Sequence, residues 1–345
     1  MNRVADLRPQ TPMFASRSSR AQNLTLLAGS LCFSLIVGEI IARALSLAPD
    51  YKFYPGICTT APGYDLRLKR NYSGVQGKVP MRTSNLGLRN PPVFEKRTTE
   101  SRILFLGDSV TFGWGVPDED VFPRLIEGEL RNHGRDVVVI NAAVIGFSTW
   151  DQLRYLELDG MELGPDLVVV CVSNNDNLQR EWVVNDRGTL TMRGTTQLRN
   201  RVTEGLFNNE FLSRHSEFYR AVKNAARNYI YAARTQSLRE SIGDDSATAS
   251  NVPQPWRTVI NQLERMAHLL ERGDQGLLVV DFTGVPGLAG RIRERGLEVI
   301  ARDLPSGPEF TLPGDGHPNR QGHEWIADEL FGEILTRLST VESGS

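Results

Sequence analysis

The middle of the chain alternates continuous hydrophobic runs with segments in which hydrophobic residues recur at helical spacing. The runs 102–107 (RILFLG), 136–141 (DVVVIN) and 166–172 (DLVVVCV) are hydrophobic at nearly every position, which is typical of strands buried on both faces. The segments 118–134 and 149–164 lie between these runs and show the helical spacing. This alternation predicts a doubly wound α/β domain, in which a parallel sheet is covered by helices on both sides.

The alternation breaks for about eighty residues, which form an insertion, 177–255. It contains a predicted hairpin around 186–188 and a polar, proline-containing loop at 241–255, and we expect it to cap the site. Hydrophobic residues of 211–230 recur at helical spacing opposite four basic residues, Arg214, Arg220, Lys223 and Arg227. Such a helix commonly packs on its own domain, and the alternative is a helix that lies on a membrane or an anionic ligand.

Regular structure is predicted again after the insertion. We expect a helix over 256–272, a strand over 276–282, a helix over 287–296, a short strand over 297–301 and a final helix after Pro318. Together with the earlier strands and helices, these elements complete an α/β domain over residues 101–340.

The chain begins with a basic tail, residues 1–23, followed by a hydrophobic segment, 24–48. The first fifteen residues of that segment are uncharged and span roughly 22 Å as a helix, which is short of a ~30 Å hydrocarbon core. A membrane span therefore has to continue past Glu39, for which Arg43 is a candidate partner four residues on. The arginines of the tail predict that it stays in the cytoplasm and that the rest of the chain lies on the far side.

A cleaved signal peptide and a buried globular helix are the alternatives to a membrane anchor. The long apolar region and Pro49, directly after Ala48, favour an uncleaved anchor. Residues 49–100 are rich in proline, glycine and turn pairs, and we expect an N-terminal arm or a small β appendage there.

Composition narrows the possible partners. Lys plus Arg number 39 against 41 for Asp plus Glu, so no basic excess points to nucleic acid. The three cysteines, Cys32, Cys58 and Cys171, show no paired spacing, so we predict neither a zinc site nor a redox motif, and a disulfide between Cys58 and Cys171 is not favoured.

Polar residues suited to catalysis follow the ends of the predicted strands. Ser109 follows the first strand, Gly146 lies after the second, and SNNDN (173–177) follows the third. Asp315 and His317 precede the final helix. Because ligand sites of open α/β sheets lie beyond the carboxyl ends of the strands, we expect these residues to meet. A serine, a histidine, a carboxylate and hydrogen-bond donors are the groups that acyl transfer requires.

The blocks GDSVTFGWG, GFS, NND and DGHPN, in this order, resemble those of the SGNH (GDSL-type) hydrolase family. The resemblance covers roughly residues 80–338 and includes SNLGLRN (84–90) and LSRHSEFYR (212–220), which resemble a membrane-anchored bacterial branch. It implies a flavodoxin-like fold, serine hydrolase activity without a metal or organic cofactor, and a catalytic domain outside the bacterial inner membrane.

The resemblance also implies roles for individual residues. Ser109 would be the nucleophile, His317 its general base and Asp315 the group that orients the imidazole. The oxyanion hole would consist of the main-chain N–H groups of Ser109 and Gly146 and the side-chain amide of Asn175. An isolated serine after a strand is more commonly a helix cap, which is the alternative for Ser109.

Two blocks depart from the family's pattern. The third block usually has glycine where this chain has Ser173, and a shift of one residue would make Asn174 the donor in place of Asn175. The last block usually places the aspartate three residues before the histidine, where Gly314 stands here, whereas Asp315 is two residues before it.

The remaining histidines are predicted to be structural. His133, His215 and His268 lie in or near predicted helices, and His323 lies in the final helix, where it would pack or cap. His317 and His323 have no third ligand at a familiar spacing, so we predict no metal site.

The sequence thus predicts a membrane-anchored serine esterase that acts on a carboxylic ester, with a short or O-acetyl group on an envelope glycan as the expected substrate. Three alternatives stay open. They are an O-acyltransferase acting on a surface polysaccharide, a lipase or lysophospholipase, and a non-catalytic envelope assembly or binding protein. The four intact blocks argue against the last, and the basic helix is compatible with a lipase.

Overall fold

The computed structural model describes residues 20–48, 56–76, 79–177, 182–184, 190–192, 209–226, 229, 254–313 and 315–344. Several predictions concern residues outside these ranges: the basic tail before Arg20, the turn at 186–188, Arg227 and the polar loop up to residue 253. Most of the insertion, 177–255, also lies outside the described residues, and its expected position as a cap over the site stays a prediction.

A five-stranded parallel sheet forms the centre of the molecule. Across the sheet the strands follow the order β6, β5, β7, β10, β11, which along the chain is the order 2-1-3-4-5 of flavodoxin-like folds and confirms the predicted fold class. The order reverses between β5 and β7, so a ligand site is expected beyond the carboxyl ends of these two strands. The strands are β5 (Ser101–Leu106), β6 (Val137–Asn141), β7 (Leu167–Val172), β10 (Gly276–Asp281) and β11 (Val299–Ala301).

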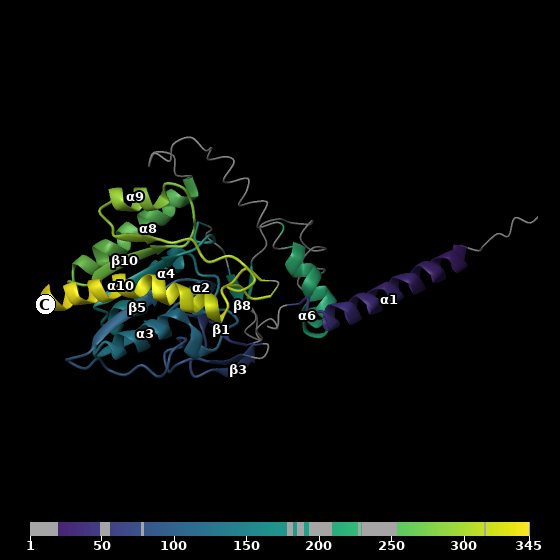
Figure 1. Cartoon of the computed structure of the whole chain (residues 1–345), viewed down its shortest axis with the longest axis horizontal. Helices are drawn as coiled ribbons and strands as arrows, with labels where there is room; N and C mark the ends of the chain where they lie inside the picture. Colours follow the sequence, from purple (N-terminus) through teal and green to yellow (C-terminus); the bar gives the residue numbers. More distant parts are fainter. Residues whose placement is uncertain are drawn as a thin grey trace, which may run out of the picture.

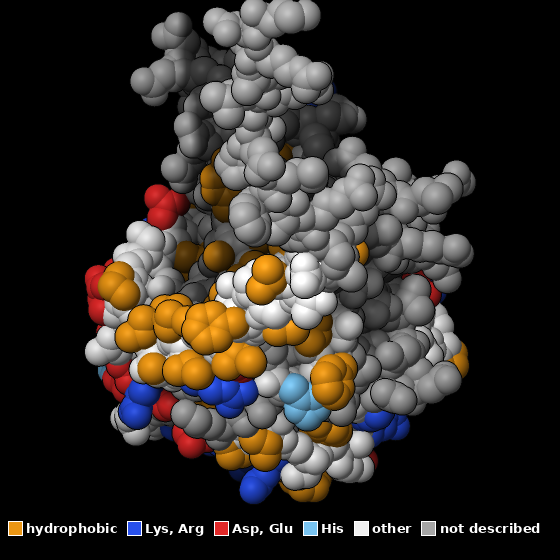
Figure 2. Space-filling model, turned by 90° about the vertical axis from the view of Figure 1, so that its right-hand side faces the viewer, with side chains coloured by type: hydrophobic (Ala, Val, Ile, Leu, Met, Phe, Trp, Pro, Cys, Tyr) orange, Lys and Arg blue, Asp and Glu red, His pale blue; other side chains and the backbone are white. Residues whose placement is uncertain are grey.

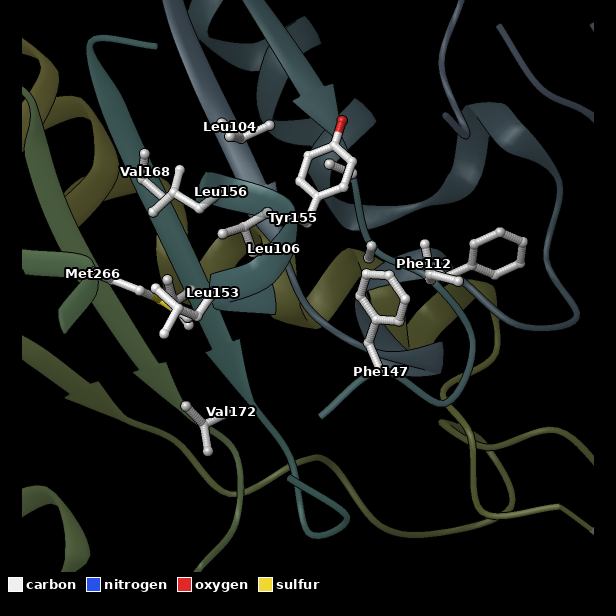
Figure 3. Packing of buried hydrophobic residues seen from close by; sticks show 14 of the residues in the cluster. Leu104, Leu106, Phe112, Phe147, Leu153, Tyr155, Leu156, Val168, Val172 and Met266 are labelled. Atoms are coloured by element: carbon white, nitrogen blue, oxygen red, sulfur yellow. The ribbon is translucent and has the colours of Figure 1, made fainter. Parts of the chain in front are cut away.

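Both faces of the sheet are buried, because successive side chains of each strand point to opposite sides. In β5, Leu104 and Leu106 enter one core and Ile103 and Phe105 the other, all with 0% exposure. Figure 3 shows the first core, in which helix residues such as Leu153 face the strands. The first face is covered by α4 (Thr149–Tyr155), α8 (Gln254–Glu271) and α9 (Leu288–Glu294), and the second by α3 (Phe122–Asn132) and α10 (Arg320–Gly344).

Two predicted helices differ in detail from the structure. The helix expected over 149–164 continues from α4 as a π-helical turn, η2 (Leu156–Gly160), and a 3₁₀ turn, η3 (Met161–Leu163). The helix expected from residue 118 begins later, since a 3₁₀ turn, η1 (Asp118–Asp120), precedes α3. Pro123 explains this start, because proline lacks an N–H and fits the first turn of a helix.

The N-terminal arm consists of two antiparallel hairpins whose hydrophobic side chains pack into the first core of the α/β domain. Ile57, Leu66, Met81 and Leu88 are each at most 3% exposed. The arm is therefore integrated into the domain that it precedes. Its strands are β1 (Cys58–Ala61), β2 (Tyr64–Leu68), β3 (Ser73–Gln76) and β4 (Val79–Arg82).

A long apolar helix, α1 (Arg20–Ala44), projects away from the α/β domain (Figure 1). Among the described residues it is the one helix long and apolar enough to cross a membrane, with a mean hydropathy of 2.1 over the most apolar 18 residues of Gln22–Ala44. The expected ion pair between Glu39 and Arg43 is present, at 2.6 Å. Figure 1 shows α6 (Glu210–His215), part of the insertion, beside the inner end of α1.

The rest of the described insertion comprises one short hairpin and one further helix. The strands β8 (Trp182–Val184) and β9 (Leu190–Met192) pair antiparallel, which confirms the hairpin predicted there. A second helix, residues 217–226, directly follows α6.

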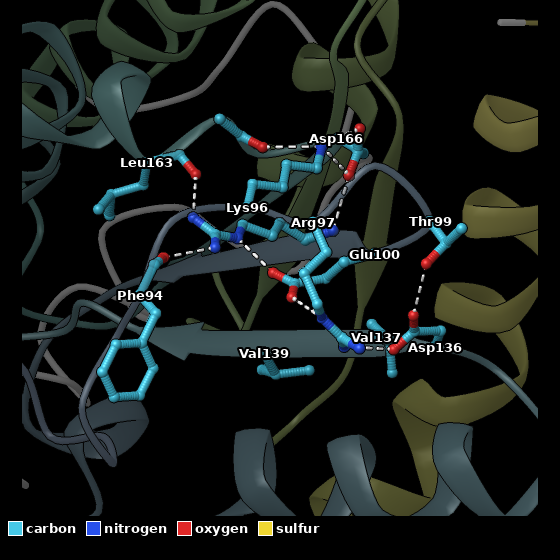
Figure 4. Close-up of polar contacts among 12 residues, drawn as sticks. Phe94, Lys96, Arg97, Thr99, Glu100, Asp136, Val137, Val139, Leu163 and Asp166 are labelled. Atoms are coloured by element: carbon cyan, nitrogen blue, oxygen red, sulfur yellow. Dashed lines mark hydrogen bonds and ion pairs between the residues drawn. The ribbon is translucent and has the colours of Figure 1, made fainter.

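Ion pairs hold the amino ends of the strands (Figure 4). The buried Arg102, at the start of β5, pairs with Glu100 at 2.6 Å and donates hydrogen bonds to the carbonyls of Leu163 and Phe94. This polar network lies at the amino ends of the strands. The residues of the candidate site lie at the opposite edge of the sheet, beyond the carboxyl ends.

Candidate active site

Ser109 lies at a tight turn from β5 into the one-turn helix α2 (Ser109–Phe112). The Asp108 carboxylate caps this helix by accepting a hydrogen bond from the N–H of Val110 at 2.9 Å. A Cβ at Gly107 would lie 2.3 Å from Thr111 Oγ1, so the turn requires glycine there. Asp108, rather than Ser109, thus caps the helix, and the Ser109 hydroxyl is available for other contacts.

His317 lies beside Ser109 although 208 positions separate them in the chain. The distance from His317 Nε2 to Ser109 Oγ is 2.8 Å. Asp315 Oδ1 bonds His317 Nδ1 and also accepts the main-chain N–H of His317 at 2.9 Å. An aspartate on Nδ1 favours the tautomer with its proton there, so Nε2 can accept the proton of a hydroxyl group.

The short spacing between Asp315 and His317 is accommodated by the turn that carries both. The N–H of Asp315 donates to the carbonyl of Leu312, and the N–H of Leu312 donates to the carbonyl of His317, each at 2.9 Å. This turn buries the Asp315 side chain, which is 1% exposed, and leaves that of His317 24% exposed. A carboxylate two residues before the histidine therefore reaches the ring.

The loop after β6 passes next to the serine turn. The N–H of Val144 donates to the carbonyl of Gly107 at 3.2 Å, and the N–H of Ala142 donates to that of Phe105 at 2.9 Å. Gly146 then adopts a left-handed conformation with φ of 83°, which favours glycine. The loop thus approaches the turn that carries Ser109.

The turn after β7 is organised by Asp176. Its carboxylate accepts the N–H of Ser173 at 2.7 Å, the Thr149 hydroxyl at 2.7 Å and the Gln152 amide at 2.8 Å. Burial and, second, the negative charge of Asp108 raise the pKa of Asp176 well above its usual range. The turn is therefore held from two sides, by its own backbone and by α4.

The same turn separates the two candidate asparagines. Asn174 is exposed, whereas Asn175 is half-buried, and its Oδ1 is buried with no hydrogen-bond partner among the described residues. An amide oxygen accepts hydrogen bonds, so this observation does not test the predicted donor role of the Asn175 amide, which stays a prediction. Ser173, which replaces the usual glycine, donates a hydrogen bond from its Oγ to Asp108 Oδ1 at 3.1 Å and so joins the turns after β5 and β7.

Two residues of this region were not assigned a role from the sequence. The fully buried Arg89 donates to the carbonyls of Phe112, at 2.7 Å, Gly113 and Val116, and it pairs with Asp118 at 2.8 Å. These contacts fix the loop after α2. The segment SNLGLRN (84–90) contains Arg89, but the sequence of this segment does not show which carbonyl groups the arginine side chain contacts.

Trp114 is the second residue that the sequence did not single out. It lies in the loop that Arg89 holds, and its ring packs against that of His317 with centroids 5.7 Å apart at 30°. Gly113 and Gly115, on either side, both have φ near 80°, which restricts the loop to one path. The glycines of GWG were the only sequence signal for this geometry.

The other histidines lie outside this group. His323 is completely buried, accepts the N–H of Phe122 at 3.3 Å on Nδ1 and stacks on the Phe122 ring. Burial first, then the positive charges of Arg89 and His317, lower its pKa to about 3. The structure shows no group of three or more histidine, cysteine or acidic side chains that could bind a metal within its described ranges.

Comparison with known proteins agrees with the arrangement of the four blocks. The family described as the GDSL-like Lipase/Acylhydrolase family matches residues 105–325, which is more than half of the chain. An arylesterase of Vibrio mimicus is 37% identical over 78 residues, or 23% of this chain and 39% of the relative. The chain therefore matches less than half the length of that relative.

Two solved esterase structures are similar to this chain at lower sequence identity than the arylesterase. The psychrotrophic esterase EstA from Pseudoalteromonas sp. is 14% identical, with a TM-score of 0.43 over 69% of this chain and 99% of that one. A two-domain esterase active on acetylated mannans, crystallised with mannopentaose, is 16% identical, with a TM-score of 0.40 over 71% of this chain and 50% of that one.

Proposed function

Because the chain belongs to the GDSL-like lipase/acylhydrolase family, we propose that it is a serine esterase that hydrolyses a carboxylic ester through an acyl-enzyme on Ser109. The observation that carries the proposal is the hydrogen-bonded series from Ser109 Oγ through His317 to Asp315. A nucleophile, a base within 2.8 Å and a carboxylate that orients the base are the parts of a serine hydrolase.

The first half of the proposed reaction forms the acyl-enzyme. His317 Nε2 takes the proton of Ser109 Oγ, which attacks the carbonyl carbon of the ester. The resulting oxyanion accepts hydrogen bonds from the N–H groups of Ser109 and Gly146 and from the Asn175 amide, each worth about 10²- to 10³-fold in turnover. The intermediate then collapses, the carbon–oxygen bond to the alcohol breaks, and the alcohol takes the proton from His317.

The second half removes the acyl group. Water attacks the acyl carbon while His317 accepts its proton, and the bond to Ser109 Oγ breaks as His317 returns that proton to the serine. The products are a carboxylic acid and the starting enzyme. Asp315 stabilises the imidazolium that forms in each half without taking up a proton.

We also propose that α1 is an uncleaved anchor in the bacterial cytoplasmic membrane, with the catalytic domain on the periplasmic or extracellular side. Its length, its hydropathy and the arginines that precede it support this. Further support comes from contacts between Glu39 and Arg43 of α1 and residues 215–218 of the insertion, because cleavage near Ala48 would remove them.

The proposed substrate is an ester with a short acyl group, in particular an O-acetyl group on an envelope glycan. The support is the proposed location, since acylated polysaccharides lie on that side of the membrane. An O-acyltransferase would use the same first half-reaction and replace water by a sugar hydroxyl in the second.

Purified full-length protein in detergent micelles tests the catalytic proposal. It is expected to release p-nitrophenol from p-nitrophenyl acetate and to react with a fluorophosphonate probe, whereas Ser109→Ala is expected to do neither. Aryl esters are suitable first substrates, since the curated relative is named an arylesterase. The matched control is Ser339→Ala on α10, whose hydroxyl accepts a hydrogen bond from Arg135 and which should react like wild type. Equal probe labelling of wild type and Ser109→Ala would refute the proposal.

A series of p-nitrophenyl esters of increasing acyl length, together with acetylated glycans, tests the substrate. Preference for acetate and release of free acetate from glycan support the proposal. A preference for long chains would assign the site to lipids, and acetyl transfer to an added sugar without release of acetate would make the protein an acyltransferase.

A further inference from the structure

The insertion is joined to the end of α1 by a specific set of hydrogen bonds. The Glu39 carboxylate accepts the Ser216 hydroxyl at 2.7 Å and the N–H groups of Glu217 and Phe218 at 3.0 and 3.1 Å. Glu39 therefore caps the first turn of helix 217–226, where main-chain N–H groups lack partners in the helix. Arg43 also donates a hydrogen bond to the carbonyl of His215 at 3.0 Å.

Small residues of α1 let the two helices approach closely. A Cβ at Gly38 would lie 3.0 Å from two ring carbons of Phe218, and Ala42 is completely buried. Phe218 thus lies directly over the backbone of α1. The contact combines close packing with hydrogen bonds, so it fixes the position of helix 217–226 along α1.

This position sets the depth of the insertion relative to a membrane. A ~30 Å hydrocarbon core takes about 20 residues of a helix at ~1.5 Å each. A span that begins near Leu24 ends near Ala44, which puts Glu39 about 7 Å inside the outer boundary of the hydrocarbon core. The residues that bond Glu39 lie at its level, so the start of helix 217–226 also lies about 7 Å inside this boundary, within the depth of ~5–10 Å to which interfacial helices insert.

The exposed side chains of this region have the composition of a membrane interface. Phe211 is 68% exposed, Val222 49% and Tyr229 77%, and Leu45 at the end of α1 is 65% exposed. Figure 2 shows the side from which α1 projects, where hydrophobic side chains, those of α1 among them, are exposed. Aromatic and aliphatic side chains at this depth bury their apolar surface in the acyl chains.

Arg220 adds a positive group at the same place. Its Nη2 pairs with Glu217 at 3.5 Å, its side chain is 12% exposed, and its Nε and Nη1 atoms are buried with no hydrogen-bond partner in the described part of the chain. Because Arg220 is largely buried and paired with Glu217, the contact with the membrane is assigned to the exposed apolar side chains.

We propose that residues 209–226 form an interfacial helical pair, seated in the outer surface of the membrane that α1 crosses, with phospholipid as its partner. The inference rests on the proposed anchor. Phe211 and Val222 then contact acyl chains, and the catalytic domain is held against the membrane at two places. The pair restricts how the domain can tilt, which a single flexible anchor does not.

Spin-label accessibility of the full-length protein in phosphatidylglycerol–phosphatidylcholine vesicles tests the proposal. Single cysteines replace Phe211, Val222, Leu31 and Phe94 in turn, in a Cys32→Ser background. The native Cys58 and Cys171 are buried and should not react, since burial raises the pKa of each thiol to about 12. For each label, collision with oxygen, which concentrates in lipid, is compared with collision with a water-soluble nickel complex.

The labels at 211 and 222 are expected to favour oxygen several-fold relative to the label at Phe94, a phenylalanine of the catalytic domain that is 77% exposed. The label at Leu31 reports on the anchor alone. Oxygen preference at 31 combined with water-like behaviour at 211 and 222 would overturn the interfacial pair and leave the anchor intact. Water-like behaviour at 31 would overturn the anchor and the interfacial pair together.

Discussion

Replacing Arg89 by leucine is expected to destabilise the protein by about 3–5 kcal/mol and to lower its activity. The change removes four hydrogen-bond contacts, to three carbonyls of the loop 112–116 and to Asp118. Hydrogen bonds from a charged group contribute roughly 1.5–3 kcal/mol each, and less where the partner can be hydrated. Asp118 is 38% exposed and can regain water, so we attribute most of the loss to the carbonyls.

Thermal unfolding of full-length protein in detergent, followed by circular dichroism, measures the effect. A loss of about 3–5 kcal/mol corresponds to a decrease in Tm of roughly 6–20 °C for a domain of this size. The kcat/KM for p-nitrophenyl acetate is expected to fall as well, because the loop that Arg89 holds carries Trp114, whose ring packs on His317. Arg89→Lys retains the charge and should restore part of the stability.

Arg97→Leu is the matched control. Arg97 belongs to the same N-terminal arm and also forms ion pairs, with Glu100 and Asp136, but its side chain is 63% exposed. Exposed ion pairs contribute about 0–1 kcal/mol, so this variant should unfold within a few degrees of wild type. If Arg89→Leu behaves like Arg97→Leu in both Tm and activity, the buried arginine does not hold the site.

Three further substitutions test the site and its surroundings. Asp315→Asn should lower kcat about 10³- to 10⁴-fold with an unchanged Tm, because an amide stabilises the wrong imidazole tautomer, and an unchanged kcat would contradict its orienting role. Ser173→Ala removes the hydrogen bond to Asp108 and should cost about 1–2 kcal/mol by thermal unfolding, so an unchanged Tm would refute this contribution. In wild type, His323 has a pKa of about 3, whereas a histidine in the unfolded chain has a pKa near 6.5. Between these two pH values the unfolded chain binds one more proton than the folded protein. The free energy of unfolding therefore falls by up to about 1.4 kcal/mol per pH unit as the pH decreases from the higher value to the lower. His323→Gln should therefore show a smaller Tm difference between about pH 7 and about pH 5, and an identical difference would exclude His323 as its source.

The central sheet could be predicted from the sequence because its signal is local. RILFLG and DLVVVCV are hydrophobic at consecutive positions, and this pattern is typical of a strand that is buried on both faces. The position of Ser109 after β5 follows from the same pattern, because catalytic groups of such folds follow strand ends. Element ends were less predictable, as the late start of α3 shows, since its proline acts through backbone geometry.

The contacts that complete the site depend on residues far apart in the chain. Arg89 reaches carbonyls 23 to 27 positions later, and a carbonyl has no side chain through which the sequence can identify it. The hydrogen bond between Ser173 and Asp108 spans 65 positions and could be recognised only when both turns were in place. The sequence presented Ser173 as a departure from the family's pattern, whereas the structure gives its hydroxyl a specific partner.

The distance of 208 positions between Ser109 and His317 has a consequence for the synthesis of the protein. A chain that leaves the ribosome at about 5–20 residues per second exposes Ser109 roughly 10–40 s before His317. Throughout that interval the serine has no base, so a hydroxyl that would otherwise attack esters stays inert while the rest of the chain is synthesised. The site is complete only after the last segment, with Asp315 and His317, has been synthesised. A chain interrupted before residue 315 therefore yields no active hydrolase.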